Sequence, residues 1–390
     1  MRLFPVLVVA SLVCGCGALT PGKDAGVGGG GGSLFGGGVG GGTGGGTTGG
    51  GTTGGGTTGG GTTGGGTTGG GTGGGTTGGG TGTGGGSAAL AWTSIGIGGS
   101  TSTSYVIALT GSATDLWAAQ DTGPLFHSTG GAFTFQFSFQ YGVKDLYASG
   151  GTVVMIQTRA IRTCTSGCTH DADFQQLDLL NSGMNWNLFG EAVCGTSPTN
   201  IVAVVSDTNN RGQLFEWHGS SWVRTNTNLP IDNPTHCWFD DAGHLYISGE
   251  DAVVYYDQGA ATPVALSNNF TSYTSGAFVG GSAWVVGPYD YVAKGAVNTF
   301  TPVTLAGAGQ LLHAVGGLSA TEVFAFGYYT STNRVGNGYR WNGTALSPVG
   351  DLIPGFGSGS TVRVVHVTGP NEFYVAGGDG SGPLVARARR

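Results

Sequence analysis

From about residue 88 to the C-terminus, short apolar runs alternate with turns that are rich in Gly, Ser, Asp, Asn and Pro. The runs are mostly about five to eight residues long, which is typical of β-strands. One turn-plus-strand segment recurs seven times, with an apolar or aromatic residue at the same place in each copy. Their mean spacing of about 43 residues is the period of a four-stranded propeller blade. These equivalent residues are Trp117, Val154, Val202, Tyr246, Trp284, Phe324 and Tyr374.

Further strands follow within each unit. The third unit continues with QLFEWHG and SSWVRTNTN, and the fourth with AVVYYDQG and ATPVAL. Turn pairs at 218–219, 258–259 and 342–343 stand where a third strand would reverse into a fourth. The pattern therefore predicts seven units of four strands each.

The last unit lacks one strand, because only GPLVARARR follows EFYVAGG. At the other end, ALAWTSI precedes the first unit and has no unit of its own. An open ring would leave an unpaired sheet edge, so we expect the N-terminal strand to pair into the last unit. The predicted fold is an all-β, seven-bladed β-propeller over residues 88–390, closed by this N-terminal strand.

These repeats resemble the kelch-like and BNR-like β-propeller lipoproteins of bacteria. The third unit reads FEWHGSSW, which keeps Gly219 and Trp222 of an Asp-box but lacks the Asp. That departure speaks against a sialidase-like activity. An outer-membrane barrel is a weaker alternative, because its strands need about 9–11 residues.

The N-terminal part of the chain has no pattern that could form a core. Of the 84 Gly residues, 40 lie between Gly26 and Gly86, in a Gly/Thr repeat. Such a chain gains little from burial and loses much backbone entropy on ordering. We expect residues 16–87 to be a disordered tether.

Residues 1–15 have the features of an export signal. Arg2 is followed by about eleven apolar residues, which is too short for a membrane-spanning helix but suits a signal peptide. The segment VCGC resembles the bacterial lipobox, which implies that Cys16 carries the lipid. Gly17, rather than Asp, follows it and implies the outer membrane. A plain secretory signal is the alternative.

Four cysteines remain after Cys16, and an even number in an exported protein implies two disulfides with three possible pairings. Cys164 and Cys168 are a natural local pair. Cys194 and Cys237 occupy nearly matching places in the first strands of two successive units. A metal site that uses Cys164, Cys168, His170, Asp171 and Asp173 is the alternative.

No catalytic motif is evident, since HExxH and GxSxG are both missing and the His residues are scattered. Two loops could hold a ligand through aromatic side chains with polar neighbours; the alternative is that these are ordinary, partly buried loop tyrosines. The candidate residues are Tyr289, Tyr291, Tyr328, Tyr329 and Arg334. With 9% charged residues, net charge −7 and no basic cluster, a nucleic-acid ligand is excluded.

The sequence thus predicts a monomeric, lipid-anchored outer-membrane scaffold that binds a protein or a glycan, without a cofactor, metal or enzymatic activity. Two alternatives stay open: a carbohydrate-active or other envelope hydrolase or lyase, and a purely structural envelope component. Acidic, His or Arg side chains converging at one channel mouth would favour the enzyme. An uncharged mouth rimmed by aromatic residues would favour binding.

Overall fold

The computed structural model describes residues 89–99, 103–180, 187–264, 266, 272–297, 299–303, 305, 310–329, 338–349, 353–357 and 359–390. They belong to a compact unit, Thr81–Arg390. The predicted signal peptide (1–15), the predicted tether (16–87) with Cys16, and Arg334 lie outside the described residues.

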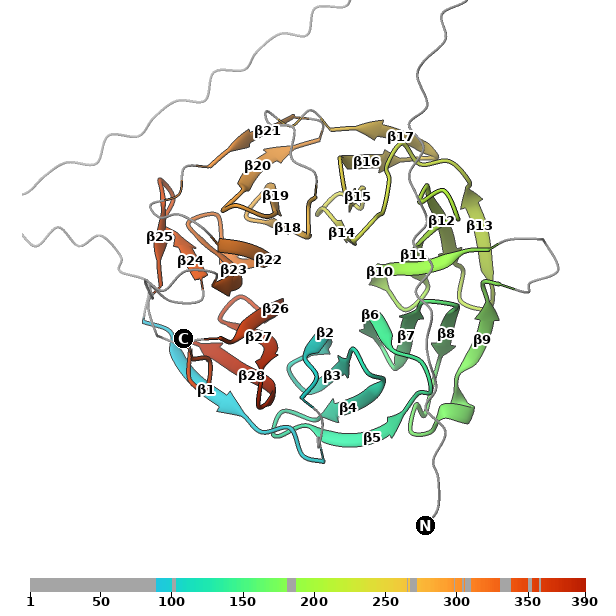
Figure 1. Cartoon of the computed structure of the whole chain (residues 1–390), viewed down its shortest axis with the longest axis horizontal. Coiled ribbons are helices and arrows are strands. Elements are labelled where there is room, and N and C mark those ends of the chain that lie inside the picture. Colours follow the sequence, from blue (N-terminus) through green and yellow to red (C-terminus); the bar gives the residue numbers. More distant parts are fainter. Residues whose placement is uncertain are drawn as a thin grey trace, which may run out of the picture. The chain divides into compact units, whose positions relative to one another are not determined.

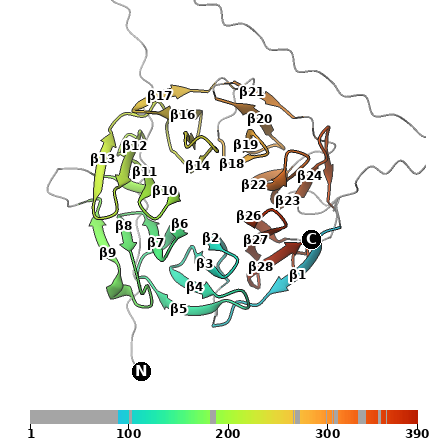
Figure 2. The same cartoon turned by 180° about the vertical axis from the view of Figure 1, so that it is seen from behind.

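The unit is built from antiparallel sheets that stand around a central axis (Figure 1), seen from behind in Figure 2. Five sheets have four strands each, in chain order, and one sheet has eight strands. The strands nearest the axis are here called the inner strands. They are β2 (Val106–Ser112), β6 (Val143–Ser149), β10 (Phe189–Ser197), β14 (His236–Phe239), β18 (Ser275–Val279), β22 (Gln310–Ser319) and β26 (Thr361–Gly369).

Two middle strands follow each inner strand. The second strands are β3 (Asp115–Gln120), β7 (Thr152–Gln157), β11 (Asn200–Ser206), β15 (Leu245–Ser248), β19 (Ser282–Val286), β23 (Glu322–Tyr329) and β27 (Glu372–Asp379). The third strands are β4 (Pro124–Ser128), β8 (Ala160–Cys164), β12 (Gly212–Trp217), β16 (Val253–Asp257), β20 (Val292–Ala296), β24 (Gly338–Trp341) and β28 (Gly382–Arg389).

Outer strands run along the periphery. They are β5 (Thr134–Ser138), β9 (Gln175–Asp178), β13 (Trp222–Asn226), β17 (Ala260–Pro263), β21 (Thr299–Pro302), β25 (Leu346–Pro348) and β1 (Ala91–Ile95). A short 3₁₀ helix, Asp171–Asp173, precedes β9. No helix among these residues is long and apolar enough to span a membrane.

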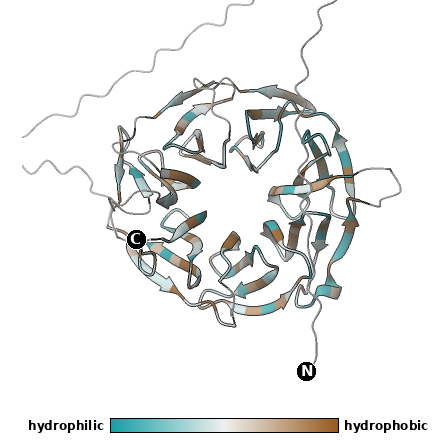
Figure 3. Ribbon diagram, in the orientation of Figure 1, coloured by the Kyte–Doolittle hydropathy of each residue, from teal (hydrophilic) through white to brown (hydrophobic). Residues whose placement is uncertain are grey.

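The middle strands explain the continuous apolar runs of the sequence. Successive side chains of a strand point to opposite faces, and each face here packs against a neighbouring sheet. In β7, Val153 and Met155 join one core cluster, whereas Val154 and Ile156 join the next. Hydrophobic residues are accordingly frequent in the inner and middle strands (Figure 3).

The N-terminal strand lies beside the last strand of the chain. β1 pairs with β28 at five positions, from Ala91 opposite Arg389 to Ile95 opposite Val385. The chain then reaches the first four-stranded sheet, where the N–H of Gly98 donates to the carbonyl of Phe133 (2.9 Å). One segment therefore joins the sheet containing the C-terminus to the sheet that begins with β2.

Candidate ligand-binding site

A cavity of about 590 Å³ lies between the inner strands, and all seven contribute to its wall. A second hollow of about 600 Å³ adjoins one end and shares Lys144, His313 and Arg363 with it. This end, where the inner strands begin, is called the mouth below. The β3–β4 turn also borders it, through Asp121.

Irregular strand pairing distinguishes one residue near the mouth end of five inner strands. In five inner strands the register with the second strand shifts by one residue at this point. A β-bulge of this kind leaves one residue out of the ladder and re-aims its side chain. The extra residues are Ile107, Lys144, Glu191, His313 and Arg363.

Threonines occupy the equivalent place directly before the two remaining inner strands, β14 and β18. The Thr235 hydroxyl donates to the carbonyl of Tyr273 (2.6 Å), and the Thr274 hydroxyl donates to that of Leu312 (2.6 Å). Each bond reaches the backbone of the following sheet. Together with the five bulge residues, Thr235 and Thr274 form what we call the mouth ring.

The mouth ring carries both signs of charge. Lys144 and Arg363 are exposed, and the Arg363 guanidinium lies 5.2 Å from the centre of the Tyr105 ring. Glu191 accepts a hydrogen bond from the Ser206 hydroxyl (2.7 Å), and burial raises its pKa. Burial, together with the nearby positive charge of Arg363, lowers the pKa of His313 to about 4. His313 is therefore neutral at neutral pH.

Deeper in the cavity, side chains link neighbouring inner strands. The N–H of Ala148 on β6 donates to Thr110 Oγ1 on β2 (3.1 Å). His366 Nε2 on β26 donates to the carbonyl of Gly111 on β2 (2.7 Å), since a carbonyl can only accept. Polar groups of the wall thus hold the sheets together.

Asp145 is another link. Its Oδ2 accepts the N–H of Val193 on β10 (2.9 Å), and its Oδ1 accepts that of Leu146 (2.8 Å). Burial raises the pKa of Asp145 to about 7, a range that suits acid–base catalysis. Both oxygens are nevertheless engaged by backbone donors, so the carboxyl already has a structural role.

The predicted ligand loops divide in the structure. Tyr289, between β19 and β20, has a positive φ of 57° and is 74% exposed. This loop lies at the mouth end of its sheet, because second strands end where inner strands begin. Tyr328 is 37% exposed at the end of β23. The Tyr329 side chain lies outside the described residues, as does Arg334.

Tyr291 requires a correction. Its side chain is 4% exposed and belongs to a core cluster, where its ring meets Tyr273 edge-on at 5.6 Å between centroids. Burial raises its pKa to about 12. The sequence places Tyr291 two residues from exposed Tyr289, but the turn between them directs the two rings differently.

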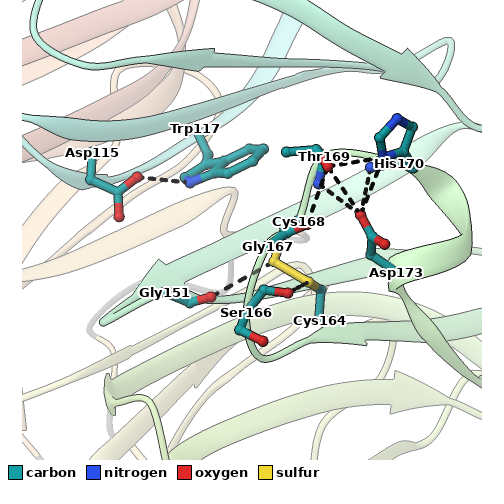
Figure 4. Close-up of a disulfide and its surroundings, with 10 residues drawn as sticks. All are labelled: Asp115, Trp117, Gly151, Cys164, Ser166, Gly167, Cys168, Thr169, His170 and Asp173. Carbon is teal, nitrogen blue, oxygen red and sulfur yellow. Dashed lines mark hydrogen bonds and ion pairs between the residues drawn. A yellow bond between two sulfur atoms is a disulfide. The ribbon is translucent and has the colours of Figure 1, made fainter.

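Both cysteine pairs are disulfides, Cys164–Cys168 and Cys194–Cys237. The second joins inner strands β10 and β14 of successive sheets. Figure 4 shows the first pair beside the loop of Thr169 and His170. Asp173 accepts the N–H groups of both residues (2.9 and 2.7 Å), so its carboxylate closes the turn.

Metal binding has little support near this disulfide. Sulfur atoms joined to each other are not available as thiolate ligands. Asp171 pairs with Arg162 Nη1 at 2.6 Å. Within the described ranges, no group of three His, Cys, Asp or Glu side chains could hold a metal ion.

The mouth ring was missed by the sequence analysis, although a signal for it exists. Each ring residue lies about ten positions before the recurring residue of its repeat, as Lys144 does before Val154. Aligned that way, the position reads Ile, Lys, Glu, Thr, Thr, His, Arg. Six of the seven residues at this position are polar, whereas many of the neighbouring positions in the strands are apolar.

No protein-family model matches this chain, and no curated protein sequence shows significant similarity to it. Solved structures do resemble it. YCF48 from Cyanidioschyzon merolae has a TM-score of 0.58 at 13% identity, covering 77% of this chain and 99% of its own. A structure of YCF48 bound to D1 peptide has a TM-score of 0.57 at 12% identity, covering 77% and 97%.

The WD40 β-propeller domain of Doa1 is similar to the same extent, with a TM-score of 0.57 at 9% identity, covering 77% of this chain and 97% of that domain. Identities this low speak for the fold alone. The protein is a β-propeller.

Proposed function

We propose that this chain is a binding scaffold of the bacterial envelope, held at the outer membrane by a lipid on Cys16. Its ligand is a protein or a glycan that engages the mouth. The observation that carries the proposal is the mouth ring, because six of its seven residues line the hollow at the entrance to the axial cavity. The ligands of propellers usually contact the loops and the mouth of such a channel.

The scaffold that we propose is a seven-bladed ring closed by β1. Two observations support this count. The eight-stranded sheet is held together at its middle by one residue pair, Tyr328 opposite Thr361. Its halves then resemble the five separate four-stranded sheets, provided that β1 supplies the outer strand of the half that begins with β26.

Lipid anchoring agrees with where the chain enters the propeller. Ala91 lies opposite Arg389, which itself lies opposite Glu372 at the start of β27. Second strands start at the end of the sheets that is remote from the mouth. A flexible tether of residues 16–87 would span about 40–50 Å r.m.s., and its point of attachment leaves the mouth unobstructed.

A protein ligand has one point in its favour beyond the fold. YCF48 was solved bound to a D1 peptide, which illustrates that a ring of similar build can take a peptide. For the chain described here, a monomer would present one mouth for each lipid anchor.

A hydrolase or lyase of the envelope is the second candidate. It is favoured by the charged mouth, where Lys144, His313 and Arg363 line one hollow, as we would expect for an enzyme rather than for an aromatic-rimmed binding site. Against it, Glu191 is bound to Ser206 and Asp145 to two backbone N–H groups. Binding needs no further group, whereas catalysis would require a free acid or base at the reacting atom.

Fractionation and an array test these proposals. Cys16→Ser should move the protein from the membrane to the soluble fraction, and unchanged detergent dependence would refute the anchor. The full chain, purified in detergent, should then bind members of a peptide and glycan array. Binding that survives Lys144→Gln and Arg363→Gln together would place the ligand elsewhere. New reducing ends or unsaturated products released from envelope polysaccharides would favour the enzyme.

A further inference from the structure

The cations of the mouth ring are unevenly distributed. Because β2 lies between β26 and β6 in the ring, Arg363 and Lys144 flank Ile107. His313 on β22 comes next to Arg363. The remaining positions are Glu191 and the two threonines. One arc of the mouth thus presents two permanent positive charges on either side of an apolar side chain.

These two cations lack an ion pair among the described residues, in contrast to three arginines of the eight-stranded sheet and the C-terminus. Arg340 and Arg390 both reach the buried Glu322, and Arg389 lies 3.7 Å from Glu372. Arg363 is held instead by the face of Tyr105. A guanidinium that stacks on an aromatic ring keeps its N–H donors at the edge, where they can bind an oxyanion.

Neighbouring acids limit which anion fits. Glu191 attracts Lys144 over a longer distance, and Asp121 is exposed on the β3–β4 turn at the same mouth. Both carboxylates lower the positive potential of the mouth. With two cations and two carboxylates at the mouth, the charges nearly balance, so a doubly charged phosphate gains little electrostatic advantage over a singly charged carboxylate. Neutral His313 adds a hydrogen-bond donor without adding charge.

We infer that the arc of Arg363, Ile107 and Lys144 binds a carboxylate of the ligand, with the attached apolar group against Ile107. This inference rests on the proposed binding function and adds the chemical class of the ligand. In a peptide, the carboxylate is the C-terminus or an acidic side chain; in a glycan, it is a uronate. Arg binds such a group through two parallel N–H donors, and Lys binds it as a point charge.

A comparison of matched ligands tests the inference. The probes are a library of hexapeptides with free C-termini, the same library amidated, and oligogalacturonate with its neutral methyl ester. The full chain in detergent should retain free-acid peptides, and amidation should weaken the best of them about tenfold or more. Retention of oligogalacturonate but not of its ester would assign the carboxylate to a glycan instead.

Variants connect the result to the arc. Arg363→Gln and Lys144→Gln should each weaken the selected probe about tenfold, whereas Arg389→Gln should leave it unchanged. Arg389 is a matched control, because its side chain is exposed and it lies opposite Glu372, at the end of the sheets that is remote from the mouth. Unchanged melting temperatures would establish that the two ring variants remain folded.

Two outcomes separate failure of the inference from failure of the proposed function. If free and amidated probes bind equally, or if inorganic phosphate competes as well as acetate does, the carboxylate inference is overturned while a binding scaffold remains. If none of the probes binds, and the intact protein also retains no partner from solubilised envelopes, both proposals are overturned.

Discussion

Removing β1 should destabilise the propeller severely, whereas removing what precedes it should not. We consider two shortened chains, one that begins at residue 87 and one that begins at residue 98. The second lacks all five backbone pairs with β28. It also lacks Leu90, Trp92, Ile95 and Ile97, which are partly buried against two core clusters.

The magnitude follows from those side chains. Full burial of a large apolar side chain contributes about 1.5–3 kcal/mol, so four partly buried ones contribute about 3–6 kcal/mol together. Trp92 also meets Phe373 edge-on at 5.4 Å, and Phe373 would become exposed. Because domains are typically stable by about 5–15 kcal/mol, this loss is a large part of the total.

Urea unfolding followed by far-UV circular dichroism measures the effect without depending on Trp92 fluorescence. We expect a much lower urea midpoint, or aggregation through the exposed edge of β28, for the chain that begins at residue 98. The chain that begins at residue 87 is the control. Equal midpoints for the two chains would refute the closure, and the seven-blade count would have to be abandoned with it.

Three other predictions concern the ion pairs of Glu322, the two disulfides and the buried histidines. Arg390→Ala should lower the free energy of unfolding by about 2–3 kcal/mol, because Glu322 is 2% exposed and would lose one of its two cations. Arg389→Ala should lower it by less than about 1 kcal/mol, because that side chain is 66% exposed. Equal losses in urea unfolding would contradict this reasoning. Replacing the Cys194–Cys237 disulfide by two serines should destabilise the fold about twice as much as replacing Cys164–Cys168. Loop-closure entropy predicts losses of about 4 and about 2 kcal/mol for sequence separations of 43 and 4. A reversed order of thermal midpoints would contradict this account of the two disulfides. Stability should rise between about pH 4 and pH 6.5, because His236 and His313 have a pKa of about 4 in the fold against an ordinary 6.5, so the unfolded chain binds protons that the folded chain does not. Asp145, whose pKa is raised to about 7, has the opposite effect on stability over this range. The double variant His236→Gln with His313→Gln should show a flatter dependence of melting temperature on pH, and an equally steep dependence would disprove the assignment.

The repeat, the strand periodicity and the disulfide pairs were open to sequence reasoning because each depends on local spacing. Strands of a propeller pair with their neighbours in the chain, so a turn between two apolar runs already specifies the partner. Cys194 and Cys237 could be matched because they stand at equivalent places in successive repeats.

The mouth ring depended on the tertiary structure. Lys144, Glu191, His313 and Arg363 are far apart in the sequence, and each appears there as a polar residue within a partly apolar strand. Local sequence does not reveal that a bulge releases each of them from its ladder, nor that curvature around an axis brings them to one mouth. Tyr291 illustrates the converse: its composition resembles that of Tyr289, and only packing against Tyr273 decided that it is buried. Local pattern determines which strands form, whereas closure of the ring determines which side chains meet.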